Sequence, residues 1–477
     1  MSDNRPLVLD VDGTFLKTDM LFECFWAGLG RDPIATLKTV AQNFRQPAVL
    51  KSKLAEIAEI RTDLLPVNED VKALAETAKA DGRDVVLASA SDISQVSRLA
   101  ADHGLSDRVF ASTPEKNLKG AAKAEALNDA YGQGGYDYAG NEPTDMPIWT
   151  DSAMPVVVGD AGSASKLEGQ GRELVEIDAG WTPRDLIRAL RPHQYVKNVL
   201  LFLPVLAAHD FTMSTLLLVL LGIVAFSAAA STIYIVNDLL DLEADRLHPT
   251  KCRRPFASGA VPIGVGMITC AVLAVIALGL GALLGGPFLG VIIVYMTLSL
   301  AYSLKLKRMR WVDIACLASL YTLRVVAGAA ASGVEASVFM LVFIFPVFIA
   351  LGCVKRLTEL TLATSDERLP GRGYGRTDRS DLLNVAGIGT FGALLMFFLY
   401  SFSEQSQALY PSRWLLWVAL VPLAIWLIRM VKLGYEGKQD YDPIVFAMKD
   451  KMGVGIILMT LSLMFYAAGL WQQWFGF

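Results

Sequence analysis

Histidine and cysteine are both scarce in this chain. Its 477 residues include four histidines and five cysteines. The cysteines form no Cys-x-x-Cys pair; they are Cys24, Cys252, Cys270, Cys316 and Cys353. Zinc sites and disulfide frameworks need such residues at short, regular spacings. The sequence therefore predicts free thiols and argues against both of those classes of protein.

Charge is also limited, and it is unevenly divided. Only 19% of the residues are charged and 53% are hydrophobic, and the mean hydropathy of +0.42 is too apolar for an ordinary soluble enzyme. Residues 1–180 hold 18 Lys and Arg against 29 Asp and Glu, while residues 181–477 hold 25 against 18. This asymmetry predicts an acidic soluble half followed by a basic membrane half. We expect no nucleic-acid partner.

From about residue 198 the sequence alternates long apolar runs with short charged loops. We predict nine membrane spans near 198–208, 214–236, 263–283, 286–304, 312–331, 336–354, 382–402, 413–432 and 453–473. Lysine and arginine concentrate in the loops 237–262, 305–311, 355–381 and 433–452. Because such loops stay on the cytoplasmic side, we expect a multi-pass protein of the inner or plasma membrane. The opening "MSDNRPLVLDVDGT" lacks a secretory signal, so we expect the first domain to be cytoplasmic.

A linker at 179–197 separates the two halves. Its sequence "AGWTPRDLIRALRPHQY" fits a short interfacial helix that Thr182 caps and Pro183 begins. A plain domain linker is the alternative.

Acids and bases are dense at 237–255, where the sequence reads "NDLLDLEADRLHPTKCRRP". On a helix, four oxygen-bearing side chains would share one side, namely Asn237, Asp238, Asp241 and Asp245. Clustered carboxylates repel one another unless a cation neutralises them, and oxygen ligands suit Mg²⁺. The bases Lys251, Arg253 and Arg254 follow and can pair with phosphate oxygens. The sequence thus predicts a Mg²⁺–diphosphate site. A solvated loop would explain the bases but not the acids.

This N-D-x-x-D-x-x-x-D pattern resembles the UbiA superfamily of intramembrane prenyltransferases. The resemblance implies an all-α membrane transferase domain of about nine transmembrane helices over 198–477. It also implies that Asp238 and Asp241 serve catalysis and that Mg²⁺ is the cofactor.

The loop after the sixth predicted span distinguishes branches of this superfamily. Where aromatic-acceptor members carry a second Asp-rich motif, this chain reads "KRLTEL", with Lys355, Arg356 and Glu359. Together with "RPHQYVKN" before the first span and "HPTKCRRP" after the Asp motif, that departure resembles the decaprenyl-phosphate phosphoribosyltransferase branch. It implies transfer of 5-phosphoribose from phosphoribosyl diphosphate to a polyprenyl phosphate. Candidate phosphate contacts are Arg191, Lys197, Tyr302, Lys305, Lys355 and Arg356.

Two other functions remain open for the membrane half. One is a prenyltransferase that moves a prenyl group from prenyl diphosphate to an aromatic acceptor. The other is a non-catalytic membrane protein that binds lipid phosphate, which the intact acidic pattern disfavours. All three functions, the phosphoribosyl transfer included, are compatible with an oligomer.

The soluble half begins with a buried strand followed by acids, "RPLVLDVDGTFL". The D-x-D-G-T pattern resembles motif I of the haloacid dehalogenase (HAD) superfamily. It implies an α/β domain over 1–178 in which Asp10 attacks phosphorus and Asp12 transfers a proton. Three later stretches resemble the remaining motifs in order, namely "DVVLASASD", "NLKGAAKAEAL" and "YDYAGNEPTDMPIW". They imply a phosphate-binding Ser89, a lysine for which we favour Lys119 over Lys123, and Asp145 as the last Mg²⁺ ligand. Residues 19–80 would form a small helical cap.

One position departs from the HAD pattern. Asn141 stands where an aspartate is usual, which removes one charge from the metal site. Glu142 could compensate, and Asp160 offers a second candidate for the motif. We expect either a phosphatase that removes the 5-phosphate from the lipid product or a catalytically silent domain.

Overall fold

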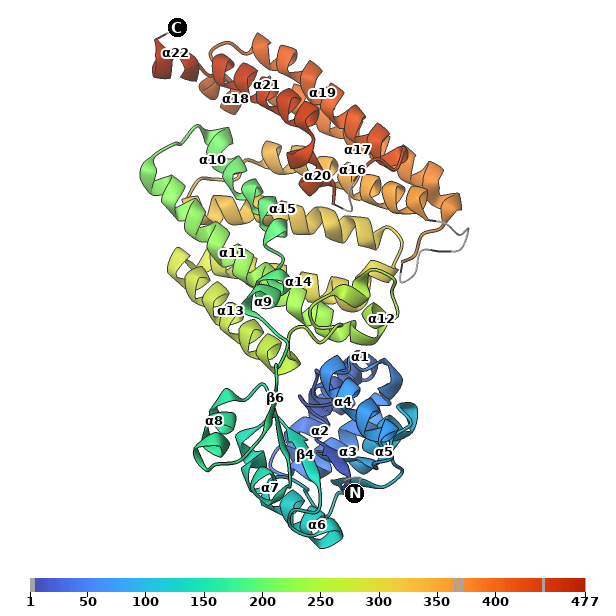
Figure 1. The fold of residues 1–477 in the computed structure, drawn as a ribbon. Coiled ribbons are helices and arrows are strands. Elements are labelled where there is room, and N and C mark those ends of the chain that lie inside the picture. Colours follow the sequence, from blue (N-terminus) through green and yellow to red (C-terminus); the bar gives the residue numbers. More distant parts are fainter. Residues whose placement is uncertain (1–4, 364–367, 369–371, 440–441, 477) are drawn as a thin grey trace. The chain divides into compact units, whose positions relative to one another are not determined.

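The chain folds into two compact units, traced in Figure 1. This computed structural model describes residues 5–363, 368, 372–439 and 442–476, so part of the predicted loop 355–381 lies outside the described residues. The first unit comprises Met1–Leu190 and Tyr234–Ala271, and the second comprises Arg191–Ile233 and Val272–Phe477. The acidic segment at 237–245 thus belongs to the same unit as the soluble half.

A six-stranded parallel sheet organises the first unit, with strand order β3-β2-β1-β4-β5-β6. The strands are β1 (Leu7–Leu9), β2 (Val85–Asp92), β3 (Val109–Ser112), β4 (Asp137–Gly140), β5 (Pro155–Val158) and β6 (Val175–Ile177). Strands buried on both faces need continuous apolar runs, as in β1, where all three residues are buried. The predicted α/β fold of the soluble half is confirmed.

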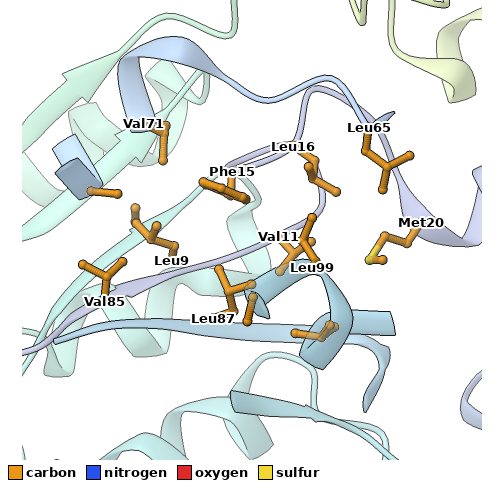
Figure 2. Close-up of a cluster of buried hydrophobic side chains, with 14 of the residues drawn as sticks. Leu9, Val11, Phe15, Leu16, Met20, Leu65, Val71, Val85, Leu87 and Leu99 are labelled. Atoms are coloured by element: carbon orange, nitrogen blue, oxygen red, sulfur yellow. The ribbon is translucent and has the colours of Figure 1, made fainter. Parts of the chain in front are cut away.

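Helices cover both faces of this sheet. They are α1 (Met20–Arg31), α2 (Pro33–Asn43), α3 (Pro47–Ala58), η1 (Thr62–Leu64), α4 (Glu69–Ala80), α5 (Ile93–Asp102), α6 (Ala121–Tyr131), η2 (Pro143–Asp145), α7 (Met146–Asp151) and α8 (Ala161–Gly169). Helix α9 (Pro183–Leu190) follows β6 and falls within the predicted linker. Leu7 and Leu9 pack with side chains from α1 and α3 to α5, whereas Val8 packs with α6, α7 and α8. Figure 2 shows the first cluster, which brings Phe15 and Leu16 together with Leu9 of β1 and Leu87 of β2.

Helices α1 to α4 occupy the region predicted as a cap, and local caps explain where two of them begin. The Asp19 side chain accepts from the backbone N–H of Phe22 at the start of α1. Asp32 does the same for Ala35, and Pro33 occupies the first turn of α2.

Seven helices among the described residues are long and apolar enough to cross a membrane. They are α11 (Met213–Leu240), α13 (Ile263–Leu284), α14 (Gly286–Leu304), α15 (Val312–Ser332), α16 (Val338–Leu362), the segment Arg376–Tyr400 and α19 (Trp414–Tyr435). The predicted count of about nine is not confirmed. The first predicted span instead forms η3 (Pro192–Phe202) and α10 (Leu203–Ala208), and the last is the 17-residue α21 (Lys451–Ala467). A perpendicular span needs roughly 20 residues.

The remaining elements are short, apart from α17, which together with η6 makes up the segment Arg376–Tyr400. They are α12 (Leu242–Arg246), η4 (Lys251–Arg253), η5 (Leu306–Arg308), η6 (Arg376–Asp378), α17 (Arg379–Tyr400), α18 (Glu404–Leu409), α20 (Pro443–Lys449) and α22 (Leu470–Phe475). Within the second unit α16, α17 and α19 lie side by side, as Figure 1 shows. The chain is an integral multi-pass membrane protein.

Candidate active sites

The acidic segment lies where α11 ends and α12 begins. The helix is interrupted at Asp241, yet the Asp241 N–H still donates to the Asn237 carbonyl at 3.0 Å and the Asp245 N–H to the Asp241 carbonyl at 2.8 Å. Helical spacing therefore persists through the break, as the sequence predicted. The carboxyl groups of Asp238 and Asp245 are both buried.

Arg254 connects these two buried acids. Its Nη1 lies 3.1 Å from Asp238 Oδ1 and 2.6 Å from Asp245 Oδ2. Burial raises the pKa of Asp245, and the Arg254 guanidinium opposes that shift. Arg254 was predicted to contact phosphate, whereas here it neutralises the acids. Lys251 and Arg253 are exposed on η4.

The donor set of this segment suits a hard cation. Asn237 Oδ1 is buried and has no hydrogen-bond partner among the described residues. Asp238 and Asp241 follow it one and four positions later. Amide and carboxylate oxygens are the ligands that Mg²⁺ takes from proteins. Within the described ranges, however, no three His, Cys, Asp or Glu side chains form a group that could hold a metal ion. The Arg254 guanidinium instead supplies the positive charge between Asp238 and Asp245.

A pair of lysines shares one buried acid in the second unit. Lys197 Nζ lies 2.5 Å from Asp442 Oδ2, and Lys355 Nζ lies 4.0 Å from the same oxygen. The Tyr321 hydroxyl also donates to it, at 2.9 Å. Burial alone would raise the pKa of Asp442, but the two lysines outweigh burial and hold the pKa well below its usual range. Two ammonium groups around one carboxylate leave an excess of positive charge and of N–H donors.

Sequence reasoning had named Lys197 and Lys355 but missed Asp442 and Tyr321. Asp442 also caps α20 by accepting from the N–H groups of Ile444 and Val445. An Asp-Pro pair before an apolar run is a helix-start signal. That signal could have located the cap in the sequence, although it says nothing of the lysines.

Arg356 differs from its neighbour Lys355, because it is fully buried and surrounded by acids. Its Nε lies 2.5 Å from Asp313 Oδ2, and its Nη1 lies 2.5 Å from Glu359 Oε2. The Tyr302 hydroxyl donates to Asp313 at 2.8 Å and accepts from Arg356 at 3.0 Å. Arg356 and Tyr302 were predicted to contact phosphate, whereas here their polar atoms are used within this network.

The other two phosphate candidates of the second unit lie elsewhere. Arg191 precedes η3 with a left-handed backbone, φ 55°, and Lys305 is exposed after α14. Neither joins the described contacts of Asp442.

In the first unit, charged groups gather where β1 and β4 end. Asp10 directly follows β1, and Lys123 Nζ from α6 lies 2.7 Å from its Oδ1. The same ammonium donates to the Tyr138 hydroxyl at 3.0 Å and lies 3.7 Å from Asp145 Oδ1. Burial raises the pKa of Asp10 to about 7, although Lys123 opposes the shift. Chain order reverses between β1 and β4, which is where open α/β sheets bind ligands.

The lysine beside Asp10 is thus Lys123, whereas the sequence favoured Lys119. Gly120 has φ +57° and precedes the first residue of α6. Lys119 therefore lies outside the helix, where it pairs with Glu142 at 3.0 Å, while Lys123 lies in the first turn and points inward.

Two serines hold the second acid of the motif. Asp12 Oδ2 accepts from Ser89 Oγ at 3.2 Å and from Ser91 Oγ at 2.7 Å. The backbone N–H of Met20 donates to its other oxygen at 2.8 Å. Ser89 was predicted and Ser91 was missed, although both belong to the same strand end.

Asn141 follows β4 and faces the turn after β1. Its Oδ1 accepts from Thr14 Oγ1 at 3.1 Å, and a Cβ added to Gly13 would come within 2.3 Å of its Nδ2. Asp145 accepts from the backbone N–H groups of Asn141 and Glu142. The predicted motif residues Asp10 and Asp145 are therefore close together, and Asn141 adjoins them. Asp160, the other candidate, caps α8.

Comparison with known proteins matches the membrane half of the chain to a protein family. The family described as "UbiA prenyltransferase family" matches residues 199–449, more than half of the chain. The uncharacterized protein y4nM of Sinorhizobium fredii is 33% identical over 470 residues, which covers 96% of this chain and 90% of that protein. The decaprenyl-phosphate phosphoribosyltransferase of Mycobacterium tuberculosis is 33% identical over 276 residues, covering 56% of this chain and 88% of the relative.

Solved structures give a more distant match. A UbiA homolog from Archaeoglobus fulgidus, bound to GPP and Mg²⁺, aligns with a TM-score of 0.46 and 13% identity, covering 60% of this chain and 99% of that chain.

Proposed function

The chain belongs to the UbiA prenyltransferase family, and we propose that its membrane domain transfers 5-phosphoribose from phosphoribosyl diphosphate to a polyprenyl phosphate. In that reaction the bond between C1 of the ribose and the diphosphate breaks. A phosphate oxygen of the lipid forms the new bond to C1, and diphosphate leaves. The relatives named decaprenyl-phosphate phosphoribosyltransferase favour this branch.

The observation that carries the proposal is the lysine pair around Asp442. A lipid phosphate is an anion, so its site needs N–H donors and positive charge rather than a second set of carboxylates. Lys197 and Lys355 provide both, and the buried Asp442 holds them together. An uncharged aromatic acceptor would have no group to pair with two ammonium groups.

The donor diphosphate is assigned to the acidic segment. Asn237, Asp238, Asp241 and Asp245 would hold Mg²⁺, which, when bound, supplies positive charge for the departing diphosphate. Arg254 then exchanges its contacts with Asp238 and Asp245 for contacts with phosphate oxygens. Lys251 and Arg253 are exposed on the same loop and can contact the outer phosphate.

A direct assay tests the transferase proposal. Purified protein with Mg²⁺, polyprenyl phosphate and ribose-labelled phosphoribosyl diphosphate should move label into the lipid phase. Transfer of label from prenyl diphosphate to an aromatic acceptor, with none from the sugar donor, would favour the alternative prenyltransferase. No transfer of either label would leave only a lipid-phosphate-binding protein.

The α/β domain supports a second activity, a phosphatase of the HAD type acting on the lipid-linked product. The supporting observation is the group formed by Asp10, Lys123 and Asp145 at the end of β1. An Asp10 oxygen would attack phosphorus while Asp12 protonates the departing 5-oxygen, and water would then cleave the acyl phosphate. Asp10, Asp12 and Asp145 would hold the Mg²⁺ that this chemistry needs. A cytoplasmic α/β domain would lie on the same membrane side as the charged loops.

Asn141 decides between an active and a decayed phosphatase. The native chain should release phosphate from the lipid product, and Asp10→Asn should accumulate 5-phosphoribosyl lipid. If only Asn141→Asp releases phosphate, the native domain is a decayed phosphatase. If neither protein releases phosphate from the lipid or from small sugar phosphates, the domain is a scaffold.

A further inference from the structure

A buried ion pair joins the cap to the segment that carries the acidic motif. Glu23 of α1 and Arg246 of α12 both belong to the first compact unit. Arg246 Nη2 lies 2.5 Å from Glu23 Oε1, and its Nη1 lies 3.1 Å from Oε2. Both side chains are more than nine-tenths buried. A two-pronged guanidinium–carboxylate contact of this kind fixes orientation as well as distance.

Both partners are held in place from their own side. Thr18 Oγ1 donates to Glu23 Oε1 at 2.7 Å, and Arg246 Nε donates to the Ala257 carbonyl at 3.1 Å. Since little rotational freedom is left to either side chain, the pair can transmit the position of α1 to α12.

Close backbone approaches extend the same contact. Gly259 has φ +70°, and a Cβ there would lie 2.6 Å from Lys17 Cβ and 3.0 Å from Pro66 Cβ. At Gly264 an added Cβ would lie 3.2 Å from the Phe22 ring. The cap and the residues just before it therefore contact the segment at three points along 246–264. The contact includes closely packed backbone as well as the Arg246 side chain.

The contact adjoins both candidate sites of this unit. Arg246 directly follows Asp245, which Arg254 binds. At the other end, the N–H of Met20, the first residue of α1, donates to Asp12. Helix α1 thus connects the acid of the phosphatase motif with the acidic segment of the transferase.

We propose that the cap clamps α12 through the Glu23–Arg246 pair, and that Glu23 is a positioning residue for the diphosphate site of the membrane domain. The effect of Glu23 on the diphosphate site rests on the proposed transferase function. The contact between the cap and α12 does not depend on that function. Removing one partner leaves the other charge buried and unpaired, and this lowers the stability of the segment. Residues 242–258 should then open locally while the sheet stays folded.

Hydrogen exchange on the full chain in nanodiscs tests the clamp directly. Glu23→Gln and Arg246→Gln should each speed exchange across 242–258 by about fivefold or more. Exchange in β1 and β4 should not change, which shows that the variants fold. Glu59→Gln is the matched control, because it breaks an exposed pair with Arg31 in the same cap.

A double-mutant cycle and one kinetic comparison complete the test. The double variant Glu23→Gln/Arg246→Gln should be no worse than the more affected single variant, because the pair acts as a unit. The KM for phosphoribosyl diphosphate should rise while the KM for lipid phosphate stays the same. Unchanged exchange over 242–258, or additive effects in the cycle, would overturn the clamp. A native chain without transferase activity would refute the proposed function. The hydrogen-exchange data would still show whether the Glu23–Arg246 pair holds residues 242–258 in place.

Discussion

Lys355 and Arg356 are adjacent in sequence, yet their side chains have different surroundings. Lys355 shares Asp442 with Lys197, whereas Arg356 is enclosed by Asp313 and Glu359. Loss of a hydrogen bond to a charged group costs about 1.5–3 kcal/mol, so Lys355→Ala should raise the KM for lipid phosphate about 10- to 100-fold. The KM for the sugar donor should not follow. Lys305→Ala, at an exposed lysine, is the control.

Arg356→Ala should instead damage stability. It leaves the buried carboxylate of Asp313 without its closest cation, a loss of about 3–5 kcal/mol. Thermal unfolding of the full chain in detergent measures this. If Arg356→Ala keeps the native melting temperature and raises only the KM for lipid phosphate, Arg356 is a substrate ligand after all.

Lys123 and Lys119 also differ sharply despite being four residues apart. Lys123 is buried against Asp10, while Lys119 is half exposed against Glu142. If the α/β domain is a phosphatase, Lys123→Ala should lower kcat by about 100-fold or more, since one positioned charge in such a site is worth that much. Lys119→Ala should change kcat little. The reverse order would restore the assignment that the sequence favoured.

At the scale of elements, the turn after β1 is crowded by the end of β4. Gly13 has φ +75° and faces Asn141, while Gly82 has φ +76° and no atom of the described residues within 4 Å of an added Cβ. Both Gly→Ala substitutions incur the backbone strain of about 1–3 kcal/mol, but only Gly13→Ala also displaces Asn141. Gly13→Ala should therefore lower the melting temperature more than Gly82→Ala. Equal decreases in melting temperature would show that the Asn141 side chain moves aside at no cost in stability.

Features formed by residues close together in the sequence were predicted, whereas contacts between residues far apart in the sequence were not. The apolar strand β1 and the acids Asp10 and Asp12 are contiguous, so the sequence displayed them together. The acidic segment was visible for the same reason, because helical spacing relates residues a few positions apart. In contrast, Asp442 lies 245 positions from Lys197, and no periodicity connects residues so far apart.

The predicted number of spans is not confirmed, for a different reason. Apolar composition near 198–208 suggested a helix, but Pro192 and Pro204 fall where the backbone forms η3 and the short α10. Hydropathy measures how apolar a segment is, and helix length depends on backbone hydrogen bonds that hydropathy does not register.

For the whole molecule, the arrangement across the membrane is the property that both proposed activities need. Cys252 lies in the basic loop 237–262 and is partly exposed, whereas Cys24 is buried and burial raises its pKa to about 12. A variant that keeps only Cys252 should react with an impermeant maleimide in inside-out vesicles and not in right-side-out vesicles. A cysteine in place of the exposed Glu335, between α15 and α16, should show the opposite pattern. Matching labelling of both positions would contradict the predicted orientation.

The central claim is that one chain carries a phosphoribosyl transferase and a site that can process its product. The most direct measurement supplies phosphoribosyl diphosphate labelled both in the ribose ring and in the 5-phosphate, together with Mg²⁺ and polyprenyl phosphate. The account predicts that ribose label enters the lipid in the native chain and in Asp10→Asn, but not in Asp238→Asn. It also predicts that the 5-phosphate label stays in the lipid only in Asp10→Asn. Transfer that persists undiminished in Asp238→Asn, or lipid that never acquires ribose label in the native chain, would contradict it.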